Sequence, residues 1–238
     1  MKNTKNAIEN PTSAETYVNR GDKLYDQGDY QAAISDYDEA IRLSPEYAIA
    51  YHNRGNAKRE LRKYFEAISD YDEAIRLNPE YAIAYGSRGN AKSKLGHPEA
   101  AIADYDEMIR LDPEHVKAYY NRGNAKSKLG KYFEAISDYD EAIRLNPEYA
   151  IAYNNRGITK SKLEHPEAAI ADYDEAICLD PEHVKAYYNR GNAKSKLGNL
   201  EDAISDYDEA IRLDPDYAAA RTNRENAENE LKERQKET

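Results

Sequence analysis

Closely spaced aspartates and glutamates are the most frequent residues in this sequence that could do chemistry. The segment Asp-Tyr-Asp-Glu-Ala-Ile recurs along the chain, once with methionine in place of alanine. A carboxylate pair can act as general acid and base when it is unique and enclosed. Here the pair is copied many times, which indicates a structural pattern, and we expect no enzyme activity. The copies begin at Asp36, Asp70, Asp104, Asp138, Asp172 and Asp206.

Histidine and cysteine, the other side chains suited to catalysis or metal binding, occur without a recognisable motif. The histidines are His52, His97, His115, His165 and His183. Their spacing matches no zinc motif, and the last four form two copies of one pair, which we expect in interhelical turns. Cys178 is the single cysteine, so an internal disulfide framework is excluded; we expect this thiol on an exposed helix face. We expect no metal and no cofactor.

The carboxylate segments recur every 34 residues, and prolines and glycines follow the same period. All 22 tyrosines fall on this grid, whereas phenylalanine occurs twice and tryptophan is absent. A fixed period of this length is typical of helix–turn–helix repeats that stack into a solenoid. The predicted repeats are 14–47, 48–81, 82–115, 116–149, 150–183 and 184–217.

Each repeat predicts two helices, as 116–149 illustrates. Its first half places small residues around Gly123, where a neighbouring helix can come close. Gly130 follows at a predicted turn, since glycine readily takes a positive φ. The second half, 132–145, carries apolar residues at three- and four-residue steps, the pattern of an amphipathic helix. Pro147 then stops the second helix.

The unit resembles the tetratricopeptide repeat. In the second repeat the residues that carry this resemblance are Tyr51, Gly55, Ala67, Tyr71, Ala74 and Pro79. The resemblance implies an all-α, right-handed superhelical solenoid of six helix-turn-helix units, with 218–238 as a solvating cap helix and 1–13 as a disordered segment. It also implies that first helices line a concave groove and second helices a convex face.

Two departures from the family pattern affect packing. Position seven of every repeat is arginine, from Arg20 to Arg190. We expect each to pair with carboxylates of its own repeat as an exposed ion pair, worth about 0–1 kcal/mol. Met108 stands where the other repeats have alanine, and overpacking predicts that Met108→Ala is neutral or stabilising.

The resemblance also places positions two, five, six, nine, twelve and thirteen of each repeat in the groove. Asparagine recurs at six and nine although it is a poor helix former, and its amide can clamp a peptide bond. Plain copying of one exposed asparagine explains the ladder equally well. The candidate groove residues are Asn53, Asn56, Asn90, Lys94, Tyr120, Asn121, Asn124, Lys128, Asn155, Lys162, Tyr188, Asn189, Asn192 and Lys196.

Charge suggests the partner. The net charge is -11, which disfavours nucleic acid and anionic membranes, and no apolar run is long enough to span a bilayer. The first half of 116–149 is nonetheless basic, and lysines at position thirteen begin at Lys94. We therefore predict a cytoplasmic, non-enzymatic scaffold, most simply a monomer, which binds an extended acidic peptide across repeats three to six. The main alternatives are a structural solenoid that self-associates through its end helices and a protein that binds through its convex face.

Overall fold

The computed structural model describes residues 13–237, where every regular element is an α-helix. The chain divides into two compact units, with the boundary between Pro113 and Glu114, and each unit is described by itself. The N-terminal unit holds α1 (Ala14–Asp26), α2 (Tyr30–Leu43), α3 (Ala48–Glu60), α4 (Tyr64–Leu77), α5 (Ala82–Lys94) and α6 (Pro98–Leu111). The C-terminal unit holds α7 (Val116–Lys128), α8 (Tyr132–Leu145), α9 (Ala150–Lys162), α10 (Pro166–Leu179), α11 (Val184–Lys196), α12 (Leu200–Leu213) and α13 (Ala218–Glu237).

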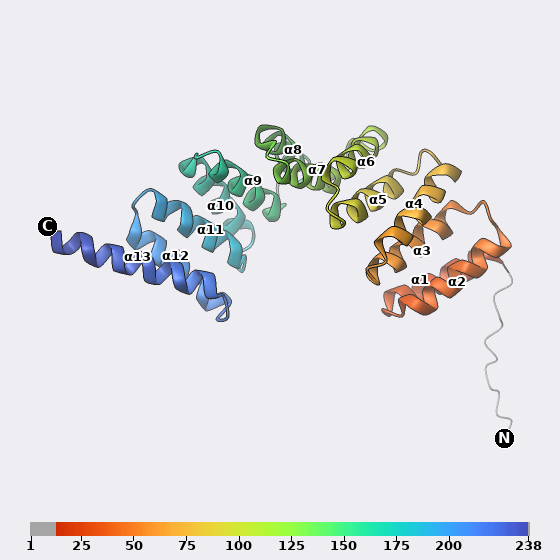
Figure 1. Cartoon of the computed structure of the whole chain (residues 1–238), viewed down its shortest axis with the longest axis horizontal. Coiled ribbons are helices and arrows are strands. Elements are labelled where there is room, and N and C mark those ends of the chain that lie inside the picture. Colours follow the sequence, from red (N-terminus) through yellow and green to blue (C-terminus); the bar gives the residue numbers. More distant parts are fainter. Residues whose placement is uncertain (1–12, 238) are drawn as a thin grey trace, which may run out of the picture. The chain divides into compact units, whose positions relative to one another are not determined.

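Within each unit, consecutive helices pack as pairs and each pair packs on the next (Figure 1). This confirms the predicted all-α fold built from helix-turn-helix units. Of the N-terminal segment 1–13, only Ser13 lies among the described residues, where its side chain accepts a hydrogen bond from the Thr16 amide and caps α1. In the described part of the chain, no helix combines the length and the apolar character needed to cross a membrane.

The turn inside each pair has a left-handed residue at a fixed place. Gly130 has a φ of 75°, as predicted, and Gly28, Gly96 and Gly198 are similar. Arg62 and Glu164 take the same conformation at φ values of 59° and 60°, although a side chain makes it costly. The turn geometry is therefore kept even where glycine has been replaced.

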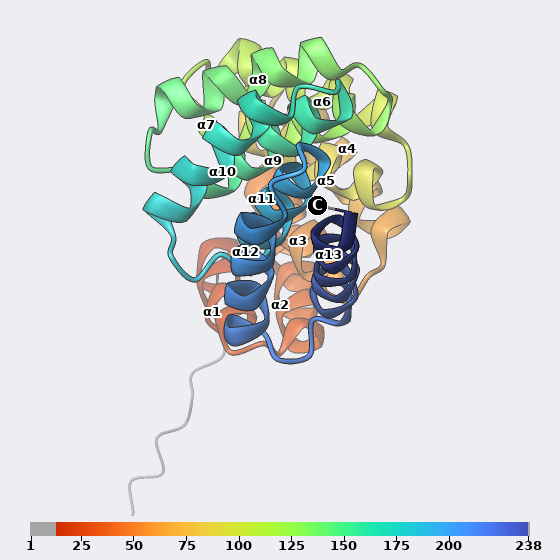
Figure 2. The same cartoon turned by 90° about the vertical axis from the view of Figure 1, so that its left-hand side faces the viewer.

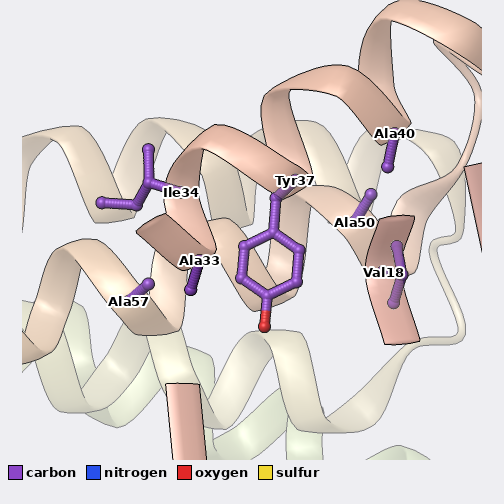
Figure 3. Close-up of a cluster of buried hydrophobic side chains, with 7 residues drawn as sticks. All are labelled: Val18, Ala33, Ile34, Tyr37, Ala40, Ala50 and Ala57. Atoms are coloured by element: carbon purple, nitrogen blue, oxygen red, sulfur yellow. The ribbon is translucent and has the colours of Figure 1, made fainter. Parts of the chain in front are cut away.

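Tyrosine forms the centre of each repeat. Tyr37 is buried among Ala33, Ile34 and Ala40 of its own helix, and Ala50 and Ala57 from α3 cover it (Figure 3). The matching tyrosines are Tyr71, Tyr105, Tyr139, Tyr173 and Tyr207, all at most 2% exposed. Each ring lies against the glycine of its first helix; a Cβ added at Gly55 would lie 2.7 Å from Tyr71 Cε1. The predicted close approach at this glycine is confirmed.

The position-seven arginines do pair with their own repeat, but the carboxylates are buried rather than exposed. Arg54 donates to Asp70 through Nε and Nη2, at 3.0 and 2.6 Å, and the Asp70 side chain is 5% exposed. Lys58 Nζ reaches the other oxygen of Asp70 at 2.7 Å. Arg54 also donates from Nη1 to Asp38 of the preceding repeat at 2.6 Å. The expectation of weak surface pairs was therefore wrong, because the arginine joins two repeats around a buried carboxylate.

Helix α13 lies beside α12 and closes the C-terminal unit (Figure 2). Ala220 and Ala227 are buried, and Ala227 packs on Leu200, Ala203 and Tyr207. The outward positions differ from those of other first helices, since Glu225 stands where they carry glycine. A glutamate there does not allow the close ring packing that glycine permits in the other repeats, and the cap role of α13 stays a prediction.

Candidate functional site

A hollow of about 530 Å³ opens on the first helices of the C-terminal unit. Its volume is within the ~300–1,000 Å³ typical of ligand sites. Its lining contains two ammonium groups and, among the described residues, no carboxylate. The lining residues are Ile158, Ser161, Lys162, Tyr173, Asn189, Asn192, Ala193, Ser195, Lys196, Tyr207, Asn223 and Asn226.

The lysines of the hollow are the last residues of their helices, Lys162 in α9 and Lys196 in α11. A cation at a helix C-terminus is favoured by the helix dipole, which explains why lysine is well tolerated at these two positions. Both side chains are exposed, and Lys162 Nζ lies 5.5 Å from the centre of the Tyr132 ring. Two positive charges therefore border one hollow whose other polar lining groups are uncharged.

Asn192 shows how the amides of this face are oriented. Its Oδ1 accepts hydrogen bonds from the Tyr207 hydroxyl at 2.9 Å and from Asn223 Nδ2 at 2.7 Å. Burial raises the pKa of Tyr207 to about 12, so this hydroxyl stays protonated and donates at neutral pH. With its oxygen held inward, Asn192 directs its NH₂ group away from these partners. The amide therefore offers hydrogen-bond donors to the hollow.

The same arrangement recurs in the fourth repeat. Asn124 Oδ1 accepts from the Tyr139 hydroxyl at 2.8 Å and from Asn155 Nδ2 at 2.9 Å. The fifth repeat breaks the pattern, because Ile158 replaces the amide and the Tyr173 hydroxyl contacts Ser161 Oγ at 3.2 Å instead. The asparagines thus have a structural role that the sequence did not reveal: they join the core tyrosine of one repeat to the first helix of the next.

The other asparagine position presents the opposite end of the amide. Asn189, which lines the hollow, donates from Nδ2 to Asn154 Oδ1 at 3.1 Å, and this leaves its Oδ1 as an acceptor for a ligand. Asn223 donates to Asn192 and, at 3.2 Å, to the Tyr188 hydroxyl, with the same result. Donors at one position and acceptors three residues earlier are what the N–H and C=O groups of an extended peptide require.

The predicted tyrosines Tyr120 and Tyr188 are half-buried and serve as packing residues. The Tyr120 ring lies 5.2 Å from the Tyr149 ring, and its hydroxyl accepts from Asn155 Nδ2 at 3.0 Å. Tyr188 makes the matching contact with Tyr217 at 5.0 Å. Most of each ring is therefore engaged inside its repeat.

The remaining predicted residues lie outside the 530 Å³ hollow. Lys128 is exposed at the end of α7, where Asn121 is half-buried. In the N-terminal unit, Lys94 is exposed at the end of α5, and Asn90 accepts from the Tyr105 hydroxyl at 2.9 Å. Asn53 donates to Asp22 at 2.9 Å.

A second, smaller hollow of about 320 Å³ belongs to the N-terminal unit and has the opposite charge. Its lining residues are Asp22, Tyr25, Asp26, Tyr37, Asn53 and Asn56. Asp22 takes the place that asparagine holds in four of the other repeats, and its Oδ1 accepts from the Tyr37 hydroxyl at 2.7 Å. The two units therefore offer first-helix faces of different polarity.

Sequence reasoning missed several residues of these faces. Asn223 and Asn226 line the C-terminal hollow, and continuing the 34-residue register beyond Tyr217 would have found them at positions six and nine. His52 is 6% exposed, with Nε2 3.1 Å from the Ser87 hydroxyl, and no pattern identified it. The described residues contain no histidine, cysteine or carboxylate cluster suited to a metal ion, and Cys178 is exposed as predicted.

Comparison with known families fits this architecture. The model described as tetratricopeptide repeat matches residues 116–149 and 184–217, and the model described as TPR repeat matches 21–61, 55–96, 94–130 and 167–198. The second model alone matches more than half of the chain. The protein therefore belongs to the tetratricopeptide repeat family. A search of curated proteins gives no significant match.

Several solved structures have a similar fold. YrrB, described as a TPR protein with an unusual peptide-binding site, is 25% identical with a TM-score of 0.66, covering 79% of this chain and 97% of YrrB. MamA is 26% identical with a TM-score of 0.65, covering 69% of this chain and 96% of MamA. Pseudomonas aeruginosa PilF is 16% identical with a TM-score of 0.77, covering 88% and 95%. At that identity, the likeness to PilF shows the fold alone.

Proposed function

We propose that the protein is a non-enzymatic interaction module whose C-terminal unit binds an extended, acidic peptide along its first helices. The observation that carries this proposal is the pair of hydrogen bonds that hold Asn192 Oδ1, since they leave the NH₂ group of this lining residue for a ligand beside Lys162 and Lys196. Ammonium and amide donors complement carboxylate and carbonyl oxygens. YrrB supports a peptide ligand, because its title reports a peptide-binding site.

The alternative of self-association through the ends is less well supported. In inner repeats, Ala50 and Ala57 pack against the preceding repeat. The matching residues of α1 are Thr16 and Lys23, both exposed. At the other end, Glu225 occupies the glycine position against which a following helix would pack. Polar residues at both ends support a finite, monomeric array.

An exposed, unpaired Cys178 supports a reducing compartment such as the cytoplasm.

The test uses charge reversal with a matched control. The ligand is a short unstructured peptide of alternating glutamate and alanine, fluorescently labelled and blocked at both ends. Lys162→Glu combined with Lys196→Glu should weaken its binding about tenfold or more at low salt, with a smaller effect at high salt. Lys131→Glu combined with Lys232→Glu makes the same charge change at exposed residues outside the hollow.

The control pair should change the affinity less than about twofold, since screening weakens distant charges. An equal loss in both double variants would show that only net charge matters and would contradict a site at the hollow. Failure of the wild-type protein to prefer this peptide over its glutamine counterpart would reject the acidic ligand.

A further inference from the structure

Helix α13 contributes more to the hollow than a cap needs to. Its outward face already carries glutamate, lysine and arginine, which keep a helix soluble and favour helix formation. Asn223 and Asn226 are poorer helix formers, yet both line the hollow. Asn223 is bound to Asn192 and Tyr188, whereas Asn226 is exposed and makes no hydrogen bond with the described part of the chain.

The helix is also held firmly in register with the rest of the unit. Arg224 pairs with Asp208 of α12 and, at 3.0 Å, with Glu228 of its own helix. Arg234 donates to the Gly198 carbonyl at 3.2 Å, close to the end of α11. These contacts, with buried Ala220 and Ala227, fix the side of α13 that meets the hollow.

We propose that α13, together with α9 and α11, forms a subsite for an anionic oxygen group on a peptide side chain, and that α13 is its third wall. The donors of this subsite are Lys162, Lys196, Asn192 and Asn226. This inference rests on the proposed function. The ammonium groups neutralise the charge, and the amide NH₂ groups of Asn192 and Asn226 each donate a hydrogen bond. Among the described residues no arginine lines the hollow, so the anion is held by point charges and single donors rather than by a bidentate fork.

A consequence is that ligand binding and the docking of α13 stabilise each other. A terminal helix belongs to the part of a fold that opens most easily. A ligand that contacts both α13 and α11 binds the docked state only, so it must shift the equilibrium toward docking. The helix then acts as a wall that the ligand itself holds in place.

The decisive comparison is between Asn226→Asp and Asn229→Asp. The two substitutions add the same charge to the same exposed face of α13, three residues apart, but Asn229 does not line the hollow. Each variant is first shown to keep wild-type helicity and melting temperature. Binding is measured with the glutamate–alanine peptide, its glutamine counterpart, and a version with phosphoserine in place of the central glutamate.

We expect Asn226→Asp to weaken binding of the glutamate peptide about tenfold, and Asn229→Asp less than about twofold. Preference for the glutamate or the phosphoserine peptide over glutamine identifies the anion as a carboxylate or a phosphate. Equal effects of the two substitutions overturn the wall assignment while leaving the proposed function intact, since that is tested by wild-type binding and by the lysine variants.

Hydrogen exchange provides a second readout. Saturating glutamate peptide should slow the exchange of α13 backbone amides in the wild-type protein and in Asn229→Asp. At that peptide concentration, the double variant Lys162→Glu, Lys196→Glu should not reach the same degree of saturation. Unchanged exchange of α13 in a fully bound wild-type protein would overturn the coupling.

Discussion

Arg156 and Asp172 form a two-point ion pair inside the fifth repeat. The guanidinium donates from Nε to Oδ2 at 3.1 Å and from Nη2 to Oδ1 at 2.6 Å, and the Asp172 side chain is 5% exposed. Lys160 Nζ adds a contact of 2.8 Å. The third guanidinium nitrogen reaches Asp140 of the preceding repeat at 2.6 Å. One arginine therefore fixes both the helix pair and its stacking on the preceding pair.

Asp172→Asn should be much more destabilising than Asp174→Asn on the same helix. The first substitution removes a buried charge and leaves two cations without it, which should lower the unfolding free energy by about 2–4 kcal/mol. Asp174 is 54% exposed and pairs with Arg190 of the next repeat, so its loss should cost about 0–1 kcal/mol. Urea unfolding followed by circular dichroism measures both, and equal costs would contradict the burial argument.

Met108 and Gly86 form a complementary pair in the third repeat, and this changes the expectation from sequence. Met108 is 4% exposed, and a Cβ on Gly86 would lie 2.3 Å from its sulfur. The glycine has made room for the longer side chain. Met108→Ala should therefore leave a cavity and lower stability by about 2–4 kcal/mol, rather than be neutral or stabilising.

The first repeat supplies the control for this prediction, because Val18 and Ala40 occupy the same two positions in one buried cluster. Gly86→Val alone should clash with Met108. Combined with Met108→Ala, it should recover most of the lost stability, which gives a coupling energy above about 1 kcal/mol. Additive effects in thermal unfolding would show that the two residues do not share their space.

The helices and the cores were predictable because residues close together in each repeat determine them. Glycine before a second helix, proline after it and tyrosine within it act over a few residues, and the structure follows them at Gly130, Pro147 and Tyr139. The site was less predictable, since it depends on contacts between repeats. Asn192 and Asn223 are 31 residues apart in sequence, and only stacking brings them together.

The buried aspartate shows the same limit within one segment. Asp172 and Asp174 lie two residues apart, so they point to different sides of α10: Asp172 toward Arg156 in the interior, and Asp174 toward Arg190 at the surface. Treating Asp-Tyr-Asp-Glu as one acidic surface segment hid that difference. The positions of the two aspartates around the helix, relative to the buried Tyr173, would have distinguished the buried one from the exposed one. Their arginine partners could be identified only from the packing of the helices.

His52 should make the stability of the N-terminal unit depend on pH. Burial lowers its pKa in the folded protein, so the unfolded chain binds the proton more readily. Its contribution to stability is therefore complete above the unfolded value of about 6.5 and decreases as pH falls below it. The slope for one proton is at most about 1.4 kcal/mol per pH unit.

His52→Asn, which copies Asn154 of the fifth repeat, should remove this pH-dependent part of the stability. Chemical unfolding between about pH 7.5 and 5.5 measures it, and parallel pH profiles for both proteins would refute it.

Removal of α13 should make the protein associate. Ala227 and Leu231 of α13 pack on Leu200, Ala203 and Tyr207, which are at most 1% exposed in the full chain. A chain that ends at Tyr217 exposes this apolar face, and such patches drive association in repeat arrays. A chain that ends at Leu231 keeps Ala220, Ala227 and Leu231 and loses only polar residues, so it is the matched control. Light scattering after size-exclusion chromatography should give a constant mass for the full chain and the control, and a mass that grows with concentration for the shorter chain. If the shorter chain stays monomeric and equally stable, α13 does not act as a cap, and its asparagines alone would account for its presence beside the hollow.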